Sequence, residues 1–138
     1  MDVTSKDTLQ ALMDASPYIK FSEMQITAMD ADAETLTLSM PLKPEFERGP
    51  GTQQFHGGPI AALIDTAGCY ALIMKTAQPV PTINFRTDYL RPAINTTLHA
   101  TATVRRVGRT IGVVDVDVVD DNDKLLAVGR GSFGTQPG

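Results

Sequence analysis

The sequence predicts an α+β domain in which one long helix packs against an antiparallel sheet of five to six strands. The first observation behind this fold class is a central segment that is apolar on almost every side. A helix of that kind has to be covered by other elements over most of its surface. The second observation is a set of shorter segments, two before the helix and four after it, in which apolar and polar residues tend to alternate. That period of two is typical of half-buried strands.

Composition and charge fit one globular domain and argue against several other classes of protein. The 138 residues are 42% hydrophobic and 20% charged, and the net charge of −4 does not favour a nucleic-acid partner. The one cysteine, Cys69, cannot form a disulfide within the chain and suits a reducing compartment, so we expect a cytoplasmic protein. Residues 1–7 lack a basic start followed by an apolar core, and Asp65 interrupts the longest apolar run. We therefore expect neither a signal peptide nor a membrane span.

The chain before the central helix is expected to supply a short helix and two strands. Residues 1–18 carry apolar side chains at helical spacing, and Pro17 should close this N-terminal helix. Residues 19–28 and 33–40 have strand-like patterns, of which the second alternates more cleanly. Residues 29–32 between them have the composition of a hairpin turn.

A long connection leads from these strands to the central helix. Residues 41–55 are rich in proline, glycine and charged side chains, and loops of this length in a small domain tend to be functional. The helix should begin near Gly57 or Gly58, because Pro59 suits the first turn of a helix. Pro79 ends it, which leaves about 17 to 18 helical residues.

Four strand-like segments with short connections follow the helix. They cover residues 82–90, 97–107, 110–120 and 125–133. Residues 135–138 form a polar tail, and residues 1–138 together are expected to make a single domain. One helix cannot cover both faces of such a sheet, so we expect the other face and the edge strands to contact further copies of the chain.

Asp65 stands out because it is the one ionised side chain within the apolar run. It either turns to solvent or pairs with an arginine, or it acts as a general base or nucleophile in an apolar site. Gly57 and Gly58 form either a simple turn or an oxyanion hole, in which an amide at the helix N-terminus faces developing negative charge. About two helical turns separate Gly57 from Asp65, so both can reach one reacting carbonyl only if they come from different subunits.

His56 allows two interpretations, a loop histidine that anchors backbone or a catalytic side chain. No serine lies in a nucleophile-elbow sequence, so a Ser-His-Asp triad is not supported. The second histidine, His99, belongs to a different element, and the chain has one cysteine, so we expect no metal site.

The central motif resembles that of a known family. His56-Gly57-Gly58, with a carboxylate at the ninth position after the histidine and Thr66-Ala67-Gly68 directly behind it, resembles the PaaI-like branch of the hotdog-fold acyl-CoA thioesterases. Further segments that are similar to this family follow in the same order, at residues 82–85, 89–93, 104–110 and 129–133. The resemblance covers about residues 20 to 134.

The resemblance implies a curved sheet wrapped around the central helix and hydrolysis of a coenzyme A thioester. In this family the carboxylate matching Asp65 is the nucleophile or general base, the amide matching Gly57 polarises the thioester carbonyl from the neighbouring subunit, and a hydroxyl at Thr82 helps to orient water. The residues expected to be catalytic are Asp65, Gly57, His56 and Thr82. Those expected to bind substrate are Gly58, Gln54, Phe55, Arg91, Arg106 and Arg109, with the arginines as candidates for the coenzyme A phosphates.

The same resemblance sets the expected partners. Coenzyme A is part of the substrate, so no separate cofactor is expected, and neither is a nucleic acid or a membrane. A homodimer is required to complete the site, and a homotetramer is expected.

One position departs from the family pattern. Many relatives carry an asparagine about six residues before the histidine, where it helps to bind the thioester carbonyl, and here that position is Pro50. Gln53 or Gln54 could take over this function, although their spacing differs. A non-catalytic acyl-CoA-binding hotdog protein is therefore one alternative to a thioesterase. A hotdog hydratase or dehydratase is another, although the differently spaced motif of those relatives is not found.

Overall fold

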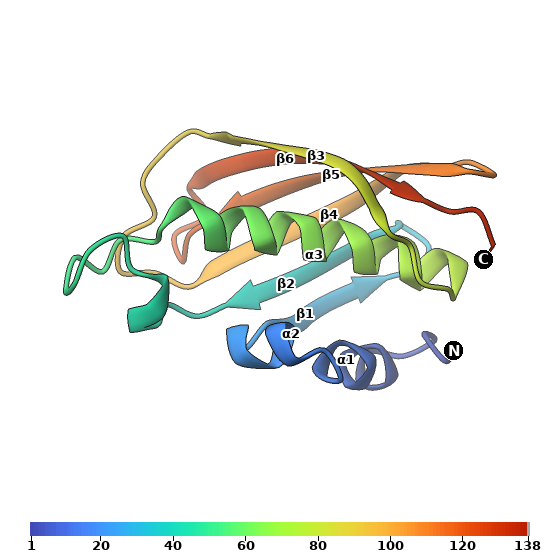
Figure 1. Ribbon diagram of the computed structural model, residues 1–138, viewed down its shortest axis with the longest axis horizontal. Helices are drawn as coiled ribbons and strands as arrows, with labels where there is room; N and C mark the ends of the chain where they lie inside the picture. The colour runs from blue at the N-terminus through green and yellow to red at the C-terminus, as the bar shows by residue number, and fades with distance from the viewer. Residues whose placement is uncertain (138) are drawn as a thin grey trace.

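A computed structural model, which describes residues 1–137, confirms that one long helix packs against an antiparallel six-stranded sheet (Figure 1). The helices are α1 (Lys6–Asp14), α2 (Pro17–Ser22), the short 3-10 helix η1 (Pro44–Phe46) and α3 (Gly57–Thr76). The strands are β1 (Gln25–Asp30), β2 (Thr35–Met40), β3 (Thr82–Tyr89), β4 (Leu98–Val107), β5 (Ile111–Val119) and β6 (Leu125–Gly134).

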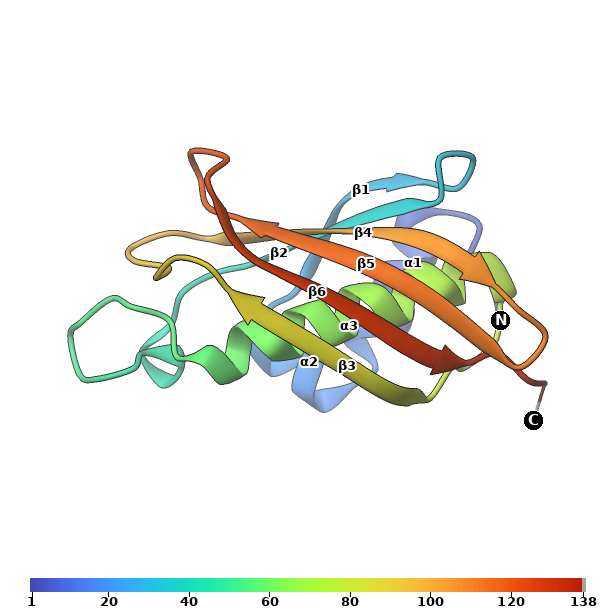
Figure 2. The same ribbon diagram turned by 90° about the horizontal axis from the view of Figure 1, so that it is seen from above.

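The sheet has the strand order β1-β2-β4-β5-β6-β3, and every pair of neighbouring strands is antiparallel. It curves around α3, which runs along one face, while α1 packs against β1 and α2 packs against α1 (Figures 1 and 2). This is the hotdog arrangement that the resemblance implied. The strand that follows α3, β3, forms one edge of the sheet, so within the described chain only β6 pairs with it.

Helix α3 packs along β4, β5 and β6 through its apolar side, which includes Leu63, Ala67 and Leu72, each fully buried. Glycines bring helix and sheet close together. A Cβ atom on Gly129 of β6 would lie only 2.6 Å from the side chain of Ile64, so any larger residue there would push the helix away. The helix has 20 residues, slightly more than predicted.

By length and composition, α3 could also cross a membrane, since its mean hydropathy reaches 1.4 over an 18-residue window. In this fold it is the core helix, and half of that window is buried inside the structure. Packing against the sheet therefore accounts for its apolar sequence.

The N-terminal region differs from the prediction in one respect. A short N-terminal helix is present and is capped by Ser5, whose side chain accepts from the Thr8 N–H at 3.1 Å. Pro17, however, does not end the helical region but opens a second helix, α2, which occupies part of the segment predicted as the first strand. Proline favours the first position of a helix, and Ser16 caps this one, so the same residue that ends α1 starts α2.

The chain is packed up to Thr135, one residue into the predicted tail. The Thr135 N–H donates to the carbonyl of Thr110 at 2.9 Å, and its hydroxyl donates to the carbonyl of Gly108 at 2.6 Å. These contacts tie the end of β6 to the β4–β5 turn. The last residue of the predicted tail, Gly138, lies outside the described residues.

Candidate active site

Asp65 and Thr82, both predicted to be catalytic, meet in the structure. Asp65 lies midway along α3, on the flank next to β3, and is half-buried. The hydroxyl of Thr82, the first residue of β3, donates to Asp65 Oδ1 at 2.7 Å. The chain reverses after α3 through Ala77, whose backbone is left-handed with φ 55°, and this return places the start of β3 beside the helix. No Lys, Arg or His nitrogen of residues 1–137 lies within 4.0 Å of the Asp65 carboxylate.

Cys69 lies one helical turn beyond Asp65 and is the nearest alternative nucleophile. Burial, together with the nearby negative charge of Asp65, raises the pKa of Cys69 to about 12. Its thiol donates to the carbonyl of Val80 at 3.5 Å. Because a thiolate is the nucleophilic form of cysteine, a thiol with a pKa raised in this way is a poor nucleophile near neutral pH. Asp65 therefore remains the candidate catalytic residue on this flank.

The residues predicted to form an oxyanion hole lie at the N-terminus of α3. His56 is the N-cap residue, and its Nδ1 accepts from the N–H of Gly58 at 3.4 Å. Its own N–H donates to the carbonyl of Phe46 at 2.7 Å. The N–H of Gly57 has no hydrogen-bond acceptor among residues 1–137. The structure thus shows His56 in the anchoring arrangement and gives Gly58 a capping contact, which leaves the amide of Gly57 open at the positive end of the helix dipole.

A groove of about 330 Å³ runs beside Gly57 and gathers four of the predicted site residues, Gln54, Phe55, Gly57 and Arg91. Phe55 is buried and forms part of its apolar side together with Ile60. Backbone pairing holds this loop in place, because the Phe55 N–H donates to the carbonyl of Ala93 at 2.9 Å.

Pro50 lies away from this groove in a tight turn. The Thr52 N–H donates to the carbonyl of Gly49 at 3.1 Å, and Gly51 has φ +74°, so Pro50 and Gly51 take the two central positions of a type II turn. Of the two glutamines weighed as replacements for the missing asparagine, Gln54 lines the groove and Gln53 is exposed in a left-handed conformation. Gln54 is thus the side-chain amide of this loop that lines the groove with Gly57.

The remaining predicted residues do not join these clusters within one chain. Gly57 and Asp65 are eight residues apart on α3, about 12 Å along the helix axis. Arg106 and Arg109 lie at the β4–β5 turn, and the register through β5 and β6 places this turn at the Thr82 end of the sheet. Arg91 follows the other end of β3. One subunit therefore holds the expected site in two separate halves.

Arg48 and Tyr89 are among the groove residues that the sequence did not single out as site residues. Tyr89 ends β3, and its hydroxyl donates to the carbonyl of Gly57 at 2.7 Å. It belongs to a segment that carried the family resemblance, but the sequence does not show which backbone group its hydroxyl meets. Arg48 has no ion-pair partner among residues 1–137.

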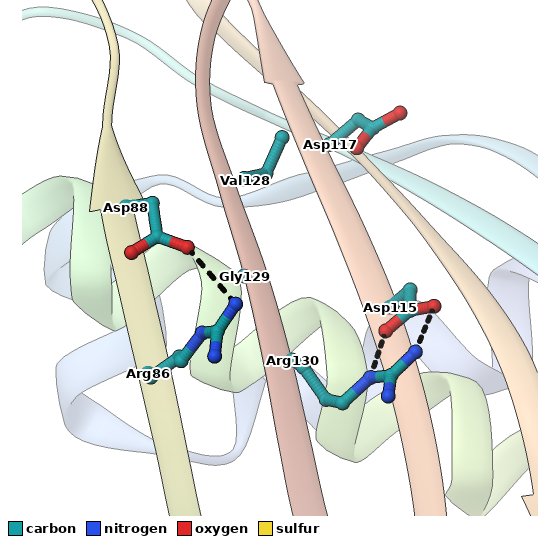
Figure 3. Close-up of a pocket in the computed structure, with 7 residues that line it drawn as sticks. All are labelled: Arg86, Asp88, Asp115, Asp117, Val128, Gly129 and Arg130. Carbon is teal, nitrogen blue, oxygen red and sulfur yellow. Dashed lines mark hydrogen bonds and ion pairs between the residues drawn. The ribbon is translucent and has the colours of Figure 1, made fainter.

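A second hollow, of about 390 Å³, lies on the opposite face of the sheet (Figure 3). Four of its five charged side chains form two ion pairs: Arg130 donates to both oxygens of Asp115 at 2.6 and 2.9 Å, and Arg86 pairs with Asp88 at 3.3 Å. The hydrogen bonds from Arg130 lower the pKa of Asp115 below its ordinary value. None of the predicted site residues lines this hollow. Across residues 1–137, no cluster of three His, Cys, Asp or Glu side chains could hold a metal ion.

Comparison with known proteins finds relatives over most of the chain. Residues 53–127 match the model of the family described as the thioesterase superfamily. A candidate esterase of Halobacterium salinarum is 37% identical over 138 aligned residues, which cover 91% of this chain and 88% of that protein. The acyl-coenzyme A thioesterase PaaI of Escherichia coli is 39% identical over 82 residues, 59% of this chain and 58% of PaaI. The solved structure of E. coli PaaI superposes with a TM-score of 0.84 at 28% identity, covering 99% of this chain and 97% of PaaI.

Proposed function

Because the chain belongs to the thioesterase superfamily, as a PaaI-like hotdog protein, we propose that it hydrolyses acyl-CoA thioesters to a free acid and coenzyme A. The observation that carries the proposal is the hydrogen bond of 2.7 Å between the Thr82 hydroxyl and the Asp65 carboxylate. It sets a half-buried carboxylate, free of cationic partners in the described chain, beside an orienting hydroxyl. This arrangement suits a base or a nucleophile better than a structural ion pair.

The reaction follows from what each group can donate or accept. Thr82 occupies Oδ1 of Asp65, and Oδ2 has no hydrogen-bond partner among residues 1–137. Oδ2 can take a proton from a water molecule whose oxygen attacks the thioester carbonyl carbon. The carbonyl electrons move onto oxygen, where the open N–H of a Gly57 stabilises the negative charge. The C–S bond then breaks, and the leaving thiolate receives the proton from Asp65. In the alternative course an oxygen of Asp65 attacks the carbonyl carbon first, and the C–S bond breaks to expel the coenzyme A thiolate, which takes a proton from water. Water then hydrolyses the resulting anhydride and returns the Asp65 carboxylate and the free acid.

A second subunit supplies the Gly57 amide in this proposal. Strand β3 is an edge strand on which the apolar side chain of Ile83 is 57% exposed, and Leu90 directly after the strand is 53% exposed. An edge of this kind is suited to pairing with a second copy of itself across a two-fold axis. Antiparallel pairing of two β3 strands would bring the Gly57 end of one chain to the Asp65 and Thr82 end of the other. We therefore propose a homodimer as the working unit, with a homotetramer as its larger assembly.

The same symmetry bears on the substrate-binding arginines. Pairing through β3 would bring Arg106 and Arg109 of one chain to the end of the assembly at which the other chain carries Arg91. We propose that members of this group bind the coenzyme A phosphates, since planar guanidinium groups suit phosphate oxygens. Coenzyme A enters as part of the substrate, and we propose that no further cofactor takes part. The lone Cys69 fits a cytoplasmic site of action.

Asp65→Asn tests the proposed reaction, because it keeps the size of the side chain and removes the base. We expect thiol release from acyl-CoAs to fall by about 100-fold or more. Asp117→Asn is the matched control, since Asp117 is exposed on the opposite sheet face. Short, medium, long and aromatic acyl-CoAs should be assayed side by side. Equal rates for wild type and Asp65→Asn across this panel would show that the assignment is wrong.

Pro50 supports one other function, a hotdog dimer that binds acyl-CoA without hydrolysing it. The type II turn at Pro50 offers no side-chain donor where many relatives have an asparagine. Calorimetry separates the two functions: tight acyl-CoA binding with no thiol release would favour the binding protein. Release of one thiol for each thioester lost would favour the hydrolase.

A further inference from the structure

We propose that Tyr89 is a positioning residue that fixes the direction of the Gly57 amide for thioester hydrolysis. Its hydroxyl donates to the carbonyl of Gly57 at 2.7 Å, across 32 residues of sequence. The bond joins the last residue of β3 to the first residue of α3. This inference rests on the proposed function and adds to it a residue outside the predicted site.

Gly57 needs an external contact of this kind. It is the first residue of α3, where the backbone N–H groups lack partners within the helix, and glycine has the widest conformational freedom of any residue. The contact from the N-cap, between His56 Nδ1 and the Gly58 N–H, is long at 3.4 Å. The bond from Tyr89 is shorter and comes from the sheet. It restrains the peptide unit that follows Gly57 and so limits rotation about the Gly57 backbone.

The close packing of the Tyr89 ring against Gly57 also supports the positioning role. A Cβ atom on residue 57 would lie 3.2 Å from the Tyr89 hydroxyl oxygen and 3.3 Å from the ring carbon that bears it. Only glycine allows the ring to come this close without a shift. Tyr89 itself is 53% exposed in the single chain, so burial in the core does not explain its placement. Its contact with Gly57 does.

The catalytic consequence is specific to the transition state. Negative charge develops on the carbonyl oxygen only as the reaction proceeds, so a misdirected Gly57 amide should weaken turnover more than substrate binding. Loss of one hydrogen bond of this kind corresponds to about a three- to tenfold effect. We expect kcat and kcat/KM to fall together by that factor while KM stays nearly constant.

The experiment compares Tyr89→Phe with Tyr18→Phe in the full-length dimer. Tyr18 is a matched control, because it is 49% exposed and its hydroxyl has no hydrogen-bond partner within residues 1–137. We expect the kcat loss only in Tyr89→Phe. We also expect the amide resonance of Gly57 to shift and its hydrogen exchange to speed up in this variant, whatever the turnover. An unchanged kcat, or an unchanged Gly57 amide, would overturn the proposal.

Gly57→Ala provides a second route if Tyr89→Phe folds poorly. The added Cβ keeps the N–H of residue 57 but presses on the Tyr89 hydroxyl, so kcat should fall in the same way. The double variant with Gly57→Ala and Tyr89→Phe should lose little more kcat than the more damaging of the two single variants, because both changes disturb the same contact. Fully additive losses would overturn the positioning role. Asp65→Asn distinguishes failure of this inference from failure of the proposed function. If turnover depended on Asp65 but not on Tyr89, the proposed hydrolysis would stand and the positioning role of Tyr89 would be overturned.

Discussion

Asp65 and Asp115 are both carboxylates held by contacts to the sheet, and their partners differ in charge. On the face of the sheet opposite α3, which we call the outer face, Asp115 receives two hydrogen bonds from Arg130 and lies 3.5 Å from Arg105. On the helix side, Asp65 receives one hydrogen bond from the neutral hydroxyl of Thr82. A carboxylate held at both oxygens by guanidinium is neutralised and has little left to offer a substrate. One with a single neutral donor keeps its charge available and one oxygen free.

Beyond the loss expected for Asp65→Asn, the largest effect in this comparison should come from Thr82→Val. The change removes the one donor that orients Asp65, and we expect kcat for acyl-CoA hydrolysis to fall about tenfold. Thr82→Ser should restore most of the activity because it restores the hydroxyl.

Thr101→Val is the control for this change. Its hydroxyl contacts that of Thr37 at 3.0 Å on the outer sheet face and should leave turnover unaltered. If Thr82→Val hydrolysed acyl-CoA as fast as wild type, the orienting role of Thr82 would be ruled out.

Asp115→Asn should show the opposite pattern, with normal kcat and slightly lower stability. Because the pair with Arg130 is exposed to solvent, its net contribution to stability should be small. Thermal unfolding and thiol release measured on the same preparation would check both halves of this expectation. A large loss of activity in Asp115→Asn would contradict the contrast between the two carboxylates.

The same ion pair predicts how stability depends on pH. The pKa of Asp115 is lowered from its ordinary 3.8, first by the hydrogen bonds from Arg130. A carboxylate with a depressed folded-state pKa contributes stability above its unfolded-state pKa and loses that contribution as pH falls through the folded-state value. Between pH 7 and pH 3, the unfolding temperature of wild type should therefore drop more than that of Asp115→Asn. Parallel drops in the two proteins would show that this pair does not set the dependence.

The smallest effect concerns Cys69, the thiol beside Asp65. With a pKa raised to about 12 by burial and by the charge of Asp65, the thiol should react very slowly with a disulfide reagent at pH 8 in the folded protein. Unfolding with denaturant should restore rapid labelling. In Asp65→Asn we expect a small increase in the labelling rate. Fast labelling of native wild type would mean that this flank of α3 is more open than the structure shows.

The central helix and the succession of strand segments along the chain could be predicted from the sequence, because a nearly all-apolar segment and a period of two leave few fold classes available. The short connections predicted a meander-like sheet, which is wrong at β3: this strand pairs with β6 at the edge of the sheet, and β4 pairs with β2. Part of the N-terminus could not be predicted either, since Pro17 fits the end of one helix and the start of the next equally well.

In the candidate site, too, some features could be predicted from the sequence and others could not. The family resemblance assigned Asp65 and Thr82 to one site, and the structure joins them by a hydrogen bond that the sequence did not predict. The bond from Tyr89 to Gly57 depends on the register of β3 against β6 and on where α3 begins, which spacing in the sequence does not encode. The cluster of arginines in the second half of the chain likewise gives no sign that Arg106 and Arg91 lie at opposite ends of the sheet.

Gly57 and Asp65 lie about 12 Å apart on one helix, and this separation predicts how mixed subunits and diluted protein should behave. If each site takes one group from each chain, a subunit that lacks the carboxylate and a subunit that lacks a usable amide are complementary. Two inactive homodimers, mixed and allowed to exchange subunits, would regain a share of the activity, because each hybrid pair contains one intact site. Specific activity would also fall on dilution as dimers dissociate, so a cell could tune this enzyme simply through how much of the chain it makes.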